Sequence, residues 1–536
     1  MISYMFIVLF FIATIPYQIY SYQDNKCPNV DEIRKCLTDS GISTKRVKYY
    51  SCGIICPDKR EVTTNDYCND IAEEKNIRIL RYPIAIVHPL NLSEVSEAIK
   101  CGAKNKIPVV ARAGGHSYES YSIGDEDFAL VVDLGSFTNI VINQGEAVVG
   151  PGIRLGKLYY ELNKARVAFP SGNCPSVGVG AILGGGEGRL TRAYGMSSDN
   201  LIDAQIVLAD GSIIDSVKNH DNGDLLWALQ GAGSAGYGIV TSLTLRTHPI
   251  IESVTAYELK YEFRLDTLKS LYSNINQFGQ YLPKTLAVEI HQIFNPDTSK
   301  DKISVKGLYL GKMSDIKGYL EIIFNTTKSD YSESDWFTAI VGNGKKAITS
   351  EASEDEVNKF VDAQDDKSRN SIKVKSFYVG TEGLSEDGVG KLFNSLNQMK
   401  NNGCGSYVIT TLYGGGKSNN NDRNKTAYVH RDFLYDIFIN MRLPEDKKDQ
   451  KNCVDQLNDF AEKFQNKYTS YESFQNYIDE DLKNWQCRYY GENFERLVDI
   501  KKRYDCSNVF RWKQSIPTTV GSYDKEQCKK NLKLTK

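Results

Sequence analysis

The chain has no excess of charge of either sign and, beyond its N-terminus, no long apolar run. Its 65 Lys and Arg residues nearly balance 67 Asp and Glu residues, which leaves a net charge of −2 over 536 residues. Proteins that bind nucleic-acid phosphates usually carry a clustered positive excess, so we expect no nucleic-acid partner. No later run reaches the roughly 18 apolar residues of a membrane-spanning helix, so we expect no membrane span after the N-terminus.

A zinc-binding cysteine pattern is also missing. Cys52 and Cys56 are not a Cys-x-x-Cys pair, and no histidine nearby completes a set of zinc ligands, so we expect no metal. The length of 536 residues is too great for one ordinary core and predicts two or three domains.

The N-terminus carries the apolar run Met-Ile-Ser-Tyr-Met-Phe-Ile-Val-Leu-Phe-Phe-Ile-Ala-Thr-Ile. Its length is typical of a secretory signal peptide, and Ser21 offers a small residue for cleavage. We therefore expect residues 1–21 to be removed and the mature protein to be secreted into the extracellular space. Because no Lys or Arg precedes the run, a signal anchor is the alternative.

Twelve cysteines in an exported chain predict disulfide bonds. Six fall within the first 101 residues, five lie beyond residue 400, and Cys174 stands alone between the two groups. If Cys174 carries a cofactor, eleven remain, so at least one is unpaired or pairs between chains. Sequons at Asn91, Asn325 and Asn424 agree with an exported glycoprotein.

The apolar and glycine patterns divide the chain into segments. Residues 22–80 are polar, Cys-rich and turn-prone, and we interpret them as a disulfide-stapled N-terminal extension. Residues 81–252 mix strands and helices without a regular strand–helix–strand alternation, which favours an α+β fold over a doubly wound sheet. Residues 253–475 carry longer helical patterns and predict a second domain, whereas residues 476–520 return to the earlier style and are expected to rejoin the first domain.

One loop with candidate chemistry is Arg112-Ala-Gly-Gly-His116-Ser-Tyr118, which follows a predicted strand. Consecutive N–H groups in such a turn can face an anion, and glycine lets a phosphate approach the backbone closely. Taken alone, the loop is better interpreted as a plain Gly-Gly turn with a surface histidine.

A second loop, from Cys174 to Gly188, changes that balance. It holds six glycines between Gly178 and Gly188, a composition that neither a packed helix nor a strand favours. A backbone that lies flat against an extended ligand tolerates such a glycine-rich composition. The two loops together therefore predict a large cofactor that carries phosphate.

Further motifs, in combination and in order, resemble one family of flavoenzymes. They are Tyr194-Gly-x-x-x-Asp-Asn200, Asp224-Leu-Leu-Trp-Ala-Leu229, Gly238-Ile-Val-Thr-Ser242, Asn476-Tyr-x-Asp479, Tyr489-Tyr-Gly-Glu-Asn493 and Asn508-Val-Phe-Arg-Trp-x-Gln-Ser-Ile516. From about residue 80 onward the chain is similar to the berberine-bridge-enzyme-like flavin oxidases of the vanillyl-alcohol-oxidase superfamily. The resemblance implies a PCMH-type FAD-binding domain, formed by residues 81–252 and 476–520, and a substrate domain of antiparallel sheet covered by helices, residues 253–475.

The resemblance also implies that FAD is attached at two points. His116 matches the histidine bonded to the flavin 8α-methyl group, and Cys174 matches the cysteine bonded to flavin C6. Val177 matches the position that controls oxygen access to flavin C4a, where valine resembles the oxidases and leucine the dehydrogenases. Tyr477 matches the second aromatic of a Tyr-x-x-Tyr motif and is the candidate base. The other residues implied to bind the cofactor are Arg112, Ala113, Gly114, Gly115, Ser117, Gly172, Gly178, Gly180, Gly184, Gly185, Gly188, Asp199, Asn200, Ile239 and Asn476.

Two positions depart from the family pattern. Phe474 replaces the first tyrosine of that motif, which leaves a two-tyrosine base incomplete. Glu187 lies where the family often has an aromatic, and it could be a base, a substrate ligand or a solvated loop charge. Tyr118 and Tyr121, just after the loop histidine, could flank the substrate. The candidate catalytic residues are Tyr118, Glu187 and Tyr477.

We therefore predict a secreted, monomeric FAD-linked oxidase. A base takes the hydroxyl proton of the substrate, hydride moves to flavin N5, and O2 reoxidises the flavin with release of H2O2. The expected small-molecule substrate is a carbohydrate oxidised at C1, with a smaller alcohol next. The alternatives are oxidation or oxidative cyclisation of a secondary metabolite, and a catalytically impaired flavin-binding protein, which Phe474 and Glu187 would favour. Outside the His116 loop no histidine, including His291, has a setting typical of a catalytic triad.

Overall fold

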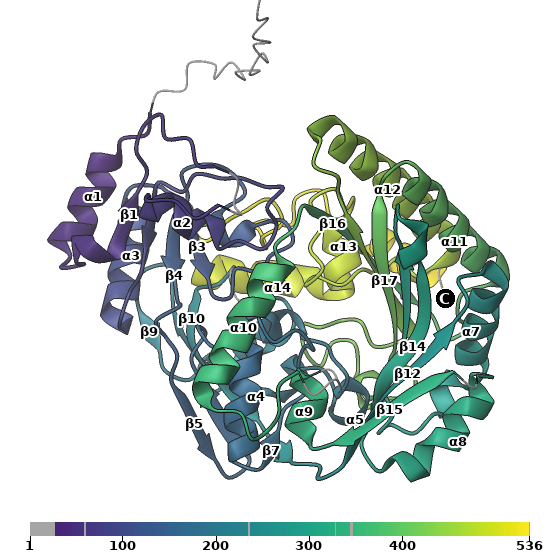
Figure 1. Cartoon of the computed structure of the whole chain (residues 1–536). Helices are drawn as coiled ribbons and strands as arrows, with labels where there is room; N and C mark the ends of the chain where they lie inside the picture. Colours follow the sequence, from purple (N-terminus) through teal and green to yellow (C-terminus); the bar gives the residue numbers. More distant parts are fainter. Residues whose placement is uncertain (1–26, 58–60, 234–235, 327, 343–346, 535–536) are drawn as a thin grey trace, which may run out of the picture.

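The computed structural model folds into two lobes, one built from the N- and C-terminal parts of the chain and one from its middle (Figure 1). The described residues are 27–57, 61–233, 236–326, 328–342 and 347–534. The predicted signal peptide, residues 1–21, lies outside them. Within the described ranges, no helix has both the length and the apolar character that crossing a bilayer would require.

The first lobe holds a four-stranded and a five-stranded sheet. Its strands are β1 (Val47–Tyr49), β2 (Ala85–Val87), β3 (Val109–Arg112), β4 (Leu130–Asp133), β5 (Ile140–Asn143), β6 (Glu146–Val149), β8 (Leu201–Val207), β9 (Ile213–Ile214) and β10 (Ile239–Arg246), with a separate pair of β7 (Val167–Ala168) and β11 (His248–Pro249). The orders are β1–β2–β4–β3, in which β2, β4 and β3 run parallel, and β5–β6–β10–β8–β9, which is antiparallel. Strands β2 and β4 are buried at every position, as their runs of Val, Ile and Leu predict.

The segment predicted as an N-terminal extension is built into this lobe. Strand β1 pairs with β2, and helix α1 (Val30–Asp39) is linked by the disulfide Cys36–Cys101 to helix α3 (Leu92–Lys104). The other disulfides are Cys27–Cys52, Cys56–Cys68, Cys404–Cys453 and Cys487–Cys528. Cys174 and the exposed Cys506 are free, so one cysteine besides Cys174 is unpaired, as the odd count predicted.

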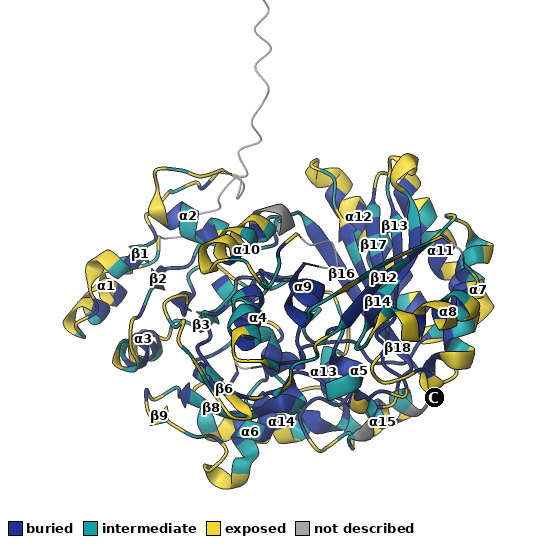
Figure 2. Ribbon diagram, turned by 60° about the horizontal axis from the view of Figure 1, so that its bottom comes forward, coloured by how far each residue is buried: buried dark blue, intermediate teal, exposed yellow. Residues whose placement is uncertain are grey.

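The second lobe is a seven-stranded antiparallel sheet with helices on its outer face (Figure 1). Its strands are β12 (Val254–Tyr261), β13 (Glu289–Phe294), β14 (Lys302–Tyr309), β15 (Ser329–Ser334), β16 (Ile372–Val379), β17 (Gly405–Leu412) and β18 (Tyr435–Arg442), and the covering helices are α7 (Leu265–Phe278), α8 (Met313–Ile323), α11 (Glu386–Asn401) and α12 (Lys447–Tyr468). The order β15–β12–β14–β13–β17–β18–β16 confirms the predicted antiparallel sheet covered by helices. Burial alternates along β17 because successive side chains point to opposite faces, one packed on helices and one turned toward the first lobe (Figure 2).

One pair of helices crosses between the lobes. Helices α9 (Trp336–Val341) and α10 (Glu354–Ser368) lie in sequence within the second lobe but pack on the first-lobe helix α4 (Leu155–Lys164), where Trp336 meets Tyr159 edge to face. The remaining helices of the first lobe are α2 (Asp66–Ala72), α5 (Thr191–Tyr194), α6 (Asp224–Leu229), α13 (Trp485–Tyr490), α14 (Phe494–Tyr504) and α15 (Lys525–Leu534). The packing of α9 and α10 on the first lobe brings together residues that are distant in sequence. The exact domain boundaries remain predictions.

Candidate active site

A cavity of about 510 Å³ is lined by residues of both lobes. Its walls come from the loop that follows β3, the loop 172–188, the strands β17 and β18, and the segment 474–478. Most of the predicted site residues lie in this wall: Ala113, Gly114, Gly115, His116, Ser117, Tyr118, Gly172, Cys174, Val177, Gly178, Gly180, Glu187, Gly188, Asn476 and Tyr477. Segments more than 350 residues apart in sequence therefore share one cavity.

Three predicted cofactor residues are not among those that line the cavity. Arg112 is buried and donates to Asp133 at 2.5 Å and to the carbonyl of Asp70 at 2.6 Å. Ile239 packs in the core beneath the four-stranded sheet. Gly184 touches Asn476, since a Cβ on this glycine would lie 1.9 Å from the Asn476 side-chain oxygen.

Three more predicted cofactor residues also make protein contacts outside the wall. Asp199 forms a two-point ion pair with Arg431 at 2.7 and 2.9 Å. Asn200 donates to the backbone carbonyl of Met196 at 2.9 Å. Gly185 packs against the rings of Phe474 and Tyr428. These residues contact other parts of the protein outside the cavity wall. The local motifs could not show whether such a residue contacts the protein or a ligand.

The glycines of the loop 178–188 also serve a purpose that the sequence did not show. Several of them let two chain segments approach each other, and the contact of Gly184 with Asn476 is one case. Another is the pair Gly114 and Gly178, where a Cβ on Gly114 would lie 2.5 Å from the Gly178 nitrogen. The missing side chains thus allow the histidine loop and the cysteine loop to pack in direct backbone contact.

His116 lies in the cavity wall as a neutral imidazole. Its Nε2 is 3.0 Å from Asp365 Oδ1, and burial lowers the pKa of His116 to about 4. Burial alone would raise the pKa of Asp365, but its contacts with His116, Arg154 and Arg369 outweigh that effect and lower it to about 2. An ionised carboxylate accepts a hydrogen bond from Nε2–H, so Nδ1 keeps the lone pair that a covalent bond to a ligand requires.

Cys174 is half-buried in the same wall and belongs to no disulfide. Its sulfur lies 3.4 Å from Ser176 Oγ. The preceding Asn173 donates to Glu289 at 3.1 Å and accepts from the Arg189 backbone N–H at 3.2 Å. These contacts fix the cysteine loop from the side of the substrate lobe.

Glu187 forms the centre of a chain of three acidic groups. Tyr477 donates its phenol hydrogen to Oε1 at 2.5 Å, and Tyr413 donates to Oε2. Burial raises the pKa of Glu187 to about 7, even though both phenol hydrogen bonds act in the opposite direction. Burial also holds the pKa of both tyrosines well above 10. The alternative of a solvated loop charge is therefore wrong.

Tyr413 supplies the second phenol that the sequence lacks at position 474. Phe474 is buried against Tyr428 and meets the ring of Tyr477 edge to face at 5.1 Å. Tyr413 follows directly after β17, whose residues Ile409 and Thr411 line the cavity as well. Side chains two residues apart on a strand share one face, so the sequence indicated that Ile409, Thr411 and Tyr413 would lie together. It did not show which face of the strand would line the cavity.

Aromatic rings surround the Tyr477 phenol. Phe438 of β18 stacks on the Tyr477 ring at 4.0 Å, and Tyr118 meets it edge to face at 5.9 Å. Tyr121 also lines the cavity. Both tyrosines of the histidine loop therefore line the cavity, and that they flank a substrate stays a prediction.

Two further carboxyl groups near the cavity were missed. Asp436 on β18 is buried, and burial together with the nearby Glu187 raises its pKa well above the ordinary value. Glu289 on β13 lines the cavity and lies 3.2 Å from Arg189 and 2.9 Å from His291. Burial opposes ionisation of Glu289, but Arg189 and His291 hold its pKa below the usual range.

His291 has a more specific setting than the sequence indicated. Its two ring nitrogens lie 2.9 Å from Glu289 and 2.5 Å from the Tyr407 hydroxyl. This Tyr–His–Glu chain is formed across β13 and β17, so its members share no local motif. Asn173 ties the chain to the cysteine loop through Glu289.

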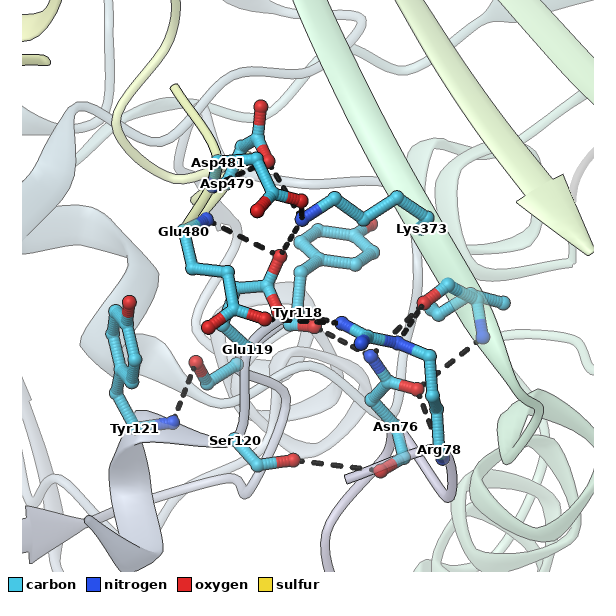
Figure 3. Close-up of polar contacts among 12 residues, drawn as sticks. Asn76, Arg78, Tyr118, Glu119, Ser120, Tyr121, Lys373, Asp479, Glu480 and Asp481 are labelled. Atoms are coloured by element: carbon cyan, nitrogen blue, oxygen red, sulfur yellow. Dashed lines mark hydrogen bonds and ion pairs between the residues drawn. The ribbon is translucent and has the colours of Figure 1, made fainter. Parts of the chain in front are cut away.

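A buried lysine joins the histidine loop to the segment that carries Tyr477. Lys373 of β16 pairs with Glu119 at 2.7 Å, Asp479 at 2.7 Å and Asp481 at 2.9 Å (Figure 3). Its side chain is 0% exposed, so the carboxylates replace water around the ammonium group. This ionic junction fixes the two halves of the site relative to each other.

Comparison with known proteins adds two family models. Residues 83–216 match an FAD binding domain, and residues 473–517 match the domain described as berberine and berberine like. Berberine bridge enzyme-like 21 from Arabidopsis thaliana is 30% identical over 469 residues, which is 82% of this chain and 84% of that protein. Chitooligosaccharide oxidase from Gibberella zeae is 29% identical over 494 residues, 89% of this chain and 96% of that protein.

Solved structures show the same fold. BBE-like 1 from Physcomitrella patens, 30% identical, superposes with a TM-score of 0.80 over 91% of this chain and 99% of its own. Glucooligosaccharide oxidase from Acremonium strictum, which carries a 6-S-cysteinyl, 8α-N1-histidyl FAD, is 24% identical and has a TM-score of 0.72 over 91% and 99% of the two chains. The α+β class with an FAD-binding domain and a substrate domain is thereby confirmed.

Proposed function

The chain belongs to the berberine bridge enzyme-like family of FAD-linked oxidoreductases, and from this membership we propose that it is a secreted oxidase of carbohydrate C1 hydroxyls. The observation that carries the proposal is the chain Tyr477–Glu187–Tyr413 in the same cavity as His116 and Cys174. A base beside two nucleophilic attachment points is the arrangement that removal of a hydroxyl proton next to a tethered flavin requires.

The cavity fits an attached flavin by the chemistry of its side chains. His116 offers an unprotonated Nδ1, because Asp365 engages the other ring nitrogen. Cys174 is the free thiol in the wall of a cavity in a protein with five disulfides. The glucooligosaccharide oxidase from Acremonium strictum holds its FAD through one histidine and one cysteine. We assign the same two attachments to this chain.

FAD held by His116 and Cys174 would supply the acceptor for hydride from the substrate carbon and the route for two electrons to O2, with H2O2 as the product. The task of the protein is to remove the hydroxyl proton. Tyr477 takes this proton on its phenol oxygen while its own hydrogen passes along the 2.5 Å contact to Glu187. A phenol with a pKa well above 10 is a poor base alone, whereas a carboxylate with a pKa of about 7 matches neutral pH.

Tyr413 keeps Glu187 in place for this transfer. Its hydrogen bond to Oε2 leaves Oε1 directed at Tyr477. The first tyrosine of the family motif, lost at Phe474, is thus replaced by one that directly follows β17. An impaired flavin-binding protein, which Phe474 seemed to favour, would have no reason to keep a hydrogen-bonded chain of this kind.

The substrate class follows from the rest of the wall. Glu289 and Asn173 form a polar side that can exchange hydrogen bonds with sugar hydroxyls, and Phe438 and Tyr118 form an aromatic side. Chitooligosaccharide oxidase, the 29% identical relative, is named for a carbohydrate substrate. A second candidate is an aromatic alcohol, which the ring pair Phe438–Tyr477 favours and which suits the relative named monolignol oxidoreductase from Arabidopsis thaliana.

A panel of sugars, oligosaccharides and aromatic alcohols tests the proposal, with H2O2 release as the readout. We expect turnover of at least one carbohydrate and flavin that stays with the polypeptide after acid precipitation. Turnover of aromatic alcohols alone would favour the second candidate. A colourless protein, or one that turns over neither class, would refute the proposed function.

Val177 tests the assignment of O2 as the acceptor. It lines the cavity directly after the cysteine loop and accepts a backbone hydrogen bond from Leu155 N–H at 2.8 Å. We expect Val177→Leu to slow reoxidation by O2 about 10-fold or more while an artificial electron acceptor is still reduced, because the added methylene narrows the path to the flavin. Stopped-flow reoxidation with and without that acceptor measures the effect. An unchanged oxygen rate would remove Val177 from this role.

A further inference from the structure

The ionic junction drawn in Figure 3 ties the loop that carries His116 to the segment that carries Tyr477. The Lys373 ammonium lies 2.7 Å from Glu119 and 2.7 Å from Asp479, and its side chain is 0% exposed. Glu119 follows His116 by three residues, and Asp479 follows Tyr477 by two. One buried cation therefore sets the spacing between the proposed attachment point and the proposed base.

The end of the junction in the histidine loop is held by tertiary contacts and not by local preference. Ser120, directly after Glu119, is buried and has a backbone φ of 52°, which is unfavourable for a residue other than glycine. On its other side Glu119 accepts from Arg78 at 2.7 Å and from the Glu480 backbone N–H at 3.3 Å. Loss of the contacts of Glu119 would free this turn to relax.

The end of the junction after Tyr477 is fixed at several points. Asp479 accepts from the Lys375 ammonium at 2.5 Å. Its backbone N–H donates to the Tyr489 hydroxyl at 3.0 Å, and its carbonyl accepts from Gln514 at 2.8 Å. Burial opposes ionisation of Asp479, but the charges of Lys375 and Lys373 hold its pKa below the usual range. Asp479 is therefore an anion that depends on its two cations.

The groups of the active site lie within a few residues of these two anchors. Tyr118 directly precedes Glu119, and its ring meets that of Tyr477 edge to face at 5.9 Å. The Tyr477 phenol donates to Glu187 at 2.5 Å. A hydrogen bond weakens steeply when its angle departs from the optimum, so a small shift of either segment would disturb the transfer of the proton.

We propose that Lys373 is a positioning residue of the reaction, whose ammonium group holds the Tyr477 phenol against Glu187 and at a fixed distance from His116. The inference rests on the proposed function, in which these groups act together. Among the described residues, those that line the cavity do not include Lys373, so it acts through the two segments that it joins.

The physical reason is the set of negative charges around Lys373. Its ammonium is shared by Glu119, Asp479 and Asp481, the last at 2.9 Å. Without the ammonium these carboxylates would face one another in a buried site, where unpaired charges are strongly unfavourable. Their repulsion would push the histidine loop and the segment after Tyr477 apart.

The decisive variant is Lys373→Met, which keeps an unbranched side chain and removes its charge. The probe is the carbohydrate of the panel that the wild-type protein oxidises fastest. We expect kcat at pH 9 to fall about 10-fold while KM changes less than about twofold, because a misplaced base slows the chemical step and leaves binding intact. At pH 9 a carboxyl group with a pKa of about 7 is ionised, so a modest shift of the pKa of Glu187 does not contribute.

Lys400→Met is the matched control. Lys400 of α11 pairs with Asp301 at 2.6 Å and its side chain is 5% exposed, so this variant also breaks a buried ion pair of the second lobe. We expect it to lower Tm and to leave kcat unchanged. An unchanged kcat in Lys373→Met, or an equal fall of kcat in Lys400→Met, would overturn the proposal.

Hydrogen exchange follows the two segments without turnover. In the FAD-containing protein, backbone amides of peptides 112–122 and 474–482 should exchange about 10-fold faster in Lys373→Met than in the wild type, and at the wild-type rate in Lys400→Met. A wild-type protein that oxidises no carbohydrate would refute the proposed function, and exchange would then decide on Lys373 by itself. Unchanged exchange in both peptides would refute its role.

Glu119→Gln covers the case in which Lys373→Met does not fold. It keeps the size of the side chain and leaves Lys373 paired with Asp479 and Asp481. We expect a smaller fall of kcat, about threefold, together with faster exchange of peptide 112–122. Values of both quantities equal to those of the wild type would overturn the assignment.

Discussion

Asp365 bonds to His116 of the cavity wall and Glu187 lies in that wall, but folding shifts the pKa values of the two carboxyl groups in opposite directions. Burial disfavours ionisation of both. Asp365 has Arg154 and Arg369 beside it, and its pKa falls to about 2. Glu187 has two phenols and no cation among its hydrogen-bond partners, and its pKa rises to about 7.

This difference shows how one cavity can hold a fixed anion and a titrating base. A carboxylate in contact with guanidinium groups keeps its charge at every physiological pH and can only orient its neighbour. A carboxylate held by neutral donors gains and loses a proton near pH 7. The carboxylate beside His116 therefore stays ionised, whereas the carboxyl group beside Tyr477 can take up and release a proton near pH 7.

The largest effect is expected from Glu187→Gln, which removes the titrating group but keeps its shape. We expect kcat to fall about 10²- to 10³-fold, the usual contribution of a general base. H2O2 release under substrate saturation measures it, and flavin on His116 and Cys174 should be unchanged. Glu289→Gln is the matched control on the polar wall and should raise KM more than it lowers kcat. A Glu187→Gln enzyme within threefold of wild type would eliminate Glu187 as the proton acceptor.

Asp365→Asn tests the other side of the comparison. We expect flavin on the His116 peptide to fall about 10-fold, the order found when the partner of a reactive histidine is lost, because Asn no longer fixes the proton on Nε2. Mass spectrometry of that peptide gives the fraction. Asp362→Asn, at an exposed position of the same helix α10, should attach flavin normally. Equal attachment in the two variants would contradict the role of Asp365.

Tyr413→Phe is expected to shift the pH profile. The Tyr413 hydrogen bond lowers the pKa of Glu187, so its loss should raise that pKa. Activity should rise with pH through about 7 in the wild type and through a value about one unit higher in the variant, with about a 10-fold loss at pH 7. Tyr407→Phe, on the same face of β17 but bonded to His291, is the control. A variant whose midpoint stays in place or moves down would refute the relay.

The smallest effect concerns stability, where the two carboxyl groups should differ in sign. The pKa of Glu187 rises on folding from about 4.5 to about 7, so its contribution to stability falls as pH rises through that window. The pKa of Asp365 drops on folding from 3.8 to about 2, so its contribution is present above pH 4 and is lost below it.

At pH 8 we therefore expect Glu187→Gln to raise Tm and Asp365→Asn to lower it, each by about 2 °C. Calorimetry on fractions with equal flavin content gives the comparison. Shifts of the same sign in both variants would mean that the difference in charge state is not what the structure indicates.

The sequence identified the loops of His116 and Cys174, the proposed attachment points, because the motifs that signal them are local. His116 and Cys174 each lie within a short motif, and a resemblance that depends on motifs places them at once. Local motifs did not show a second role of the glycines, since Gly184 and Gly114 lack side chains where other segments of the protein pack closely against them. Asp199 and Arg112 were likewise placed in motifs but serve as ion-pair partners outside the cavity wall.

The base side depended on contacts between distant segments. Tyr413 reaches Glu187 across 226 residues, and Asp365 reaches His116 across 249. Neither partner has a neighbour in sequence that signals its role. Phe474 therefore looked like a loss, although the sheet supplies the missing phenol from another strand.

The amino-acid sequence by itself determined the family, the α+β class, the pair His116 and Cys174, and the presence of disulfides, because these depend on composition and on short stretches of chain. Only the tertiary structure decided the charge states of Asp365 and Glu187 and the second phenol at Tyr413. The reason is that a pKa depends on burial and on which charges are in contact, and both are set by segments that meet only when the two lobes come together.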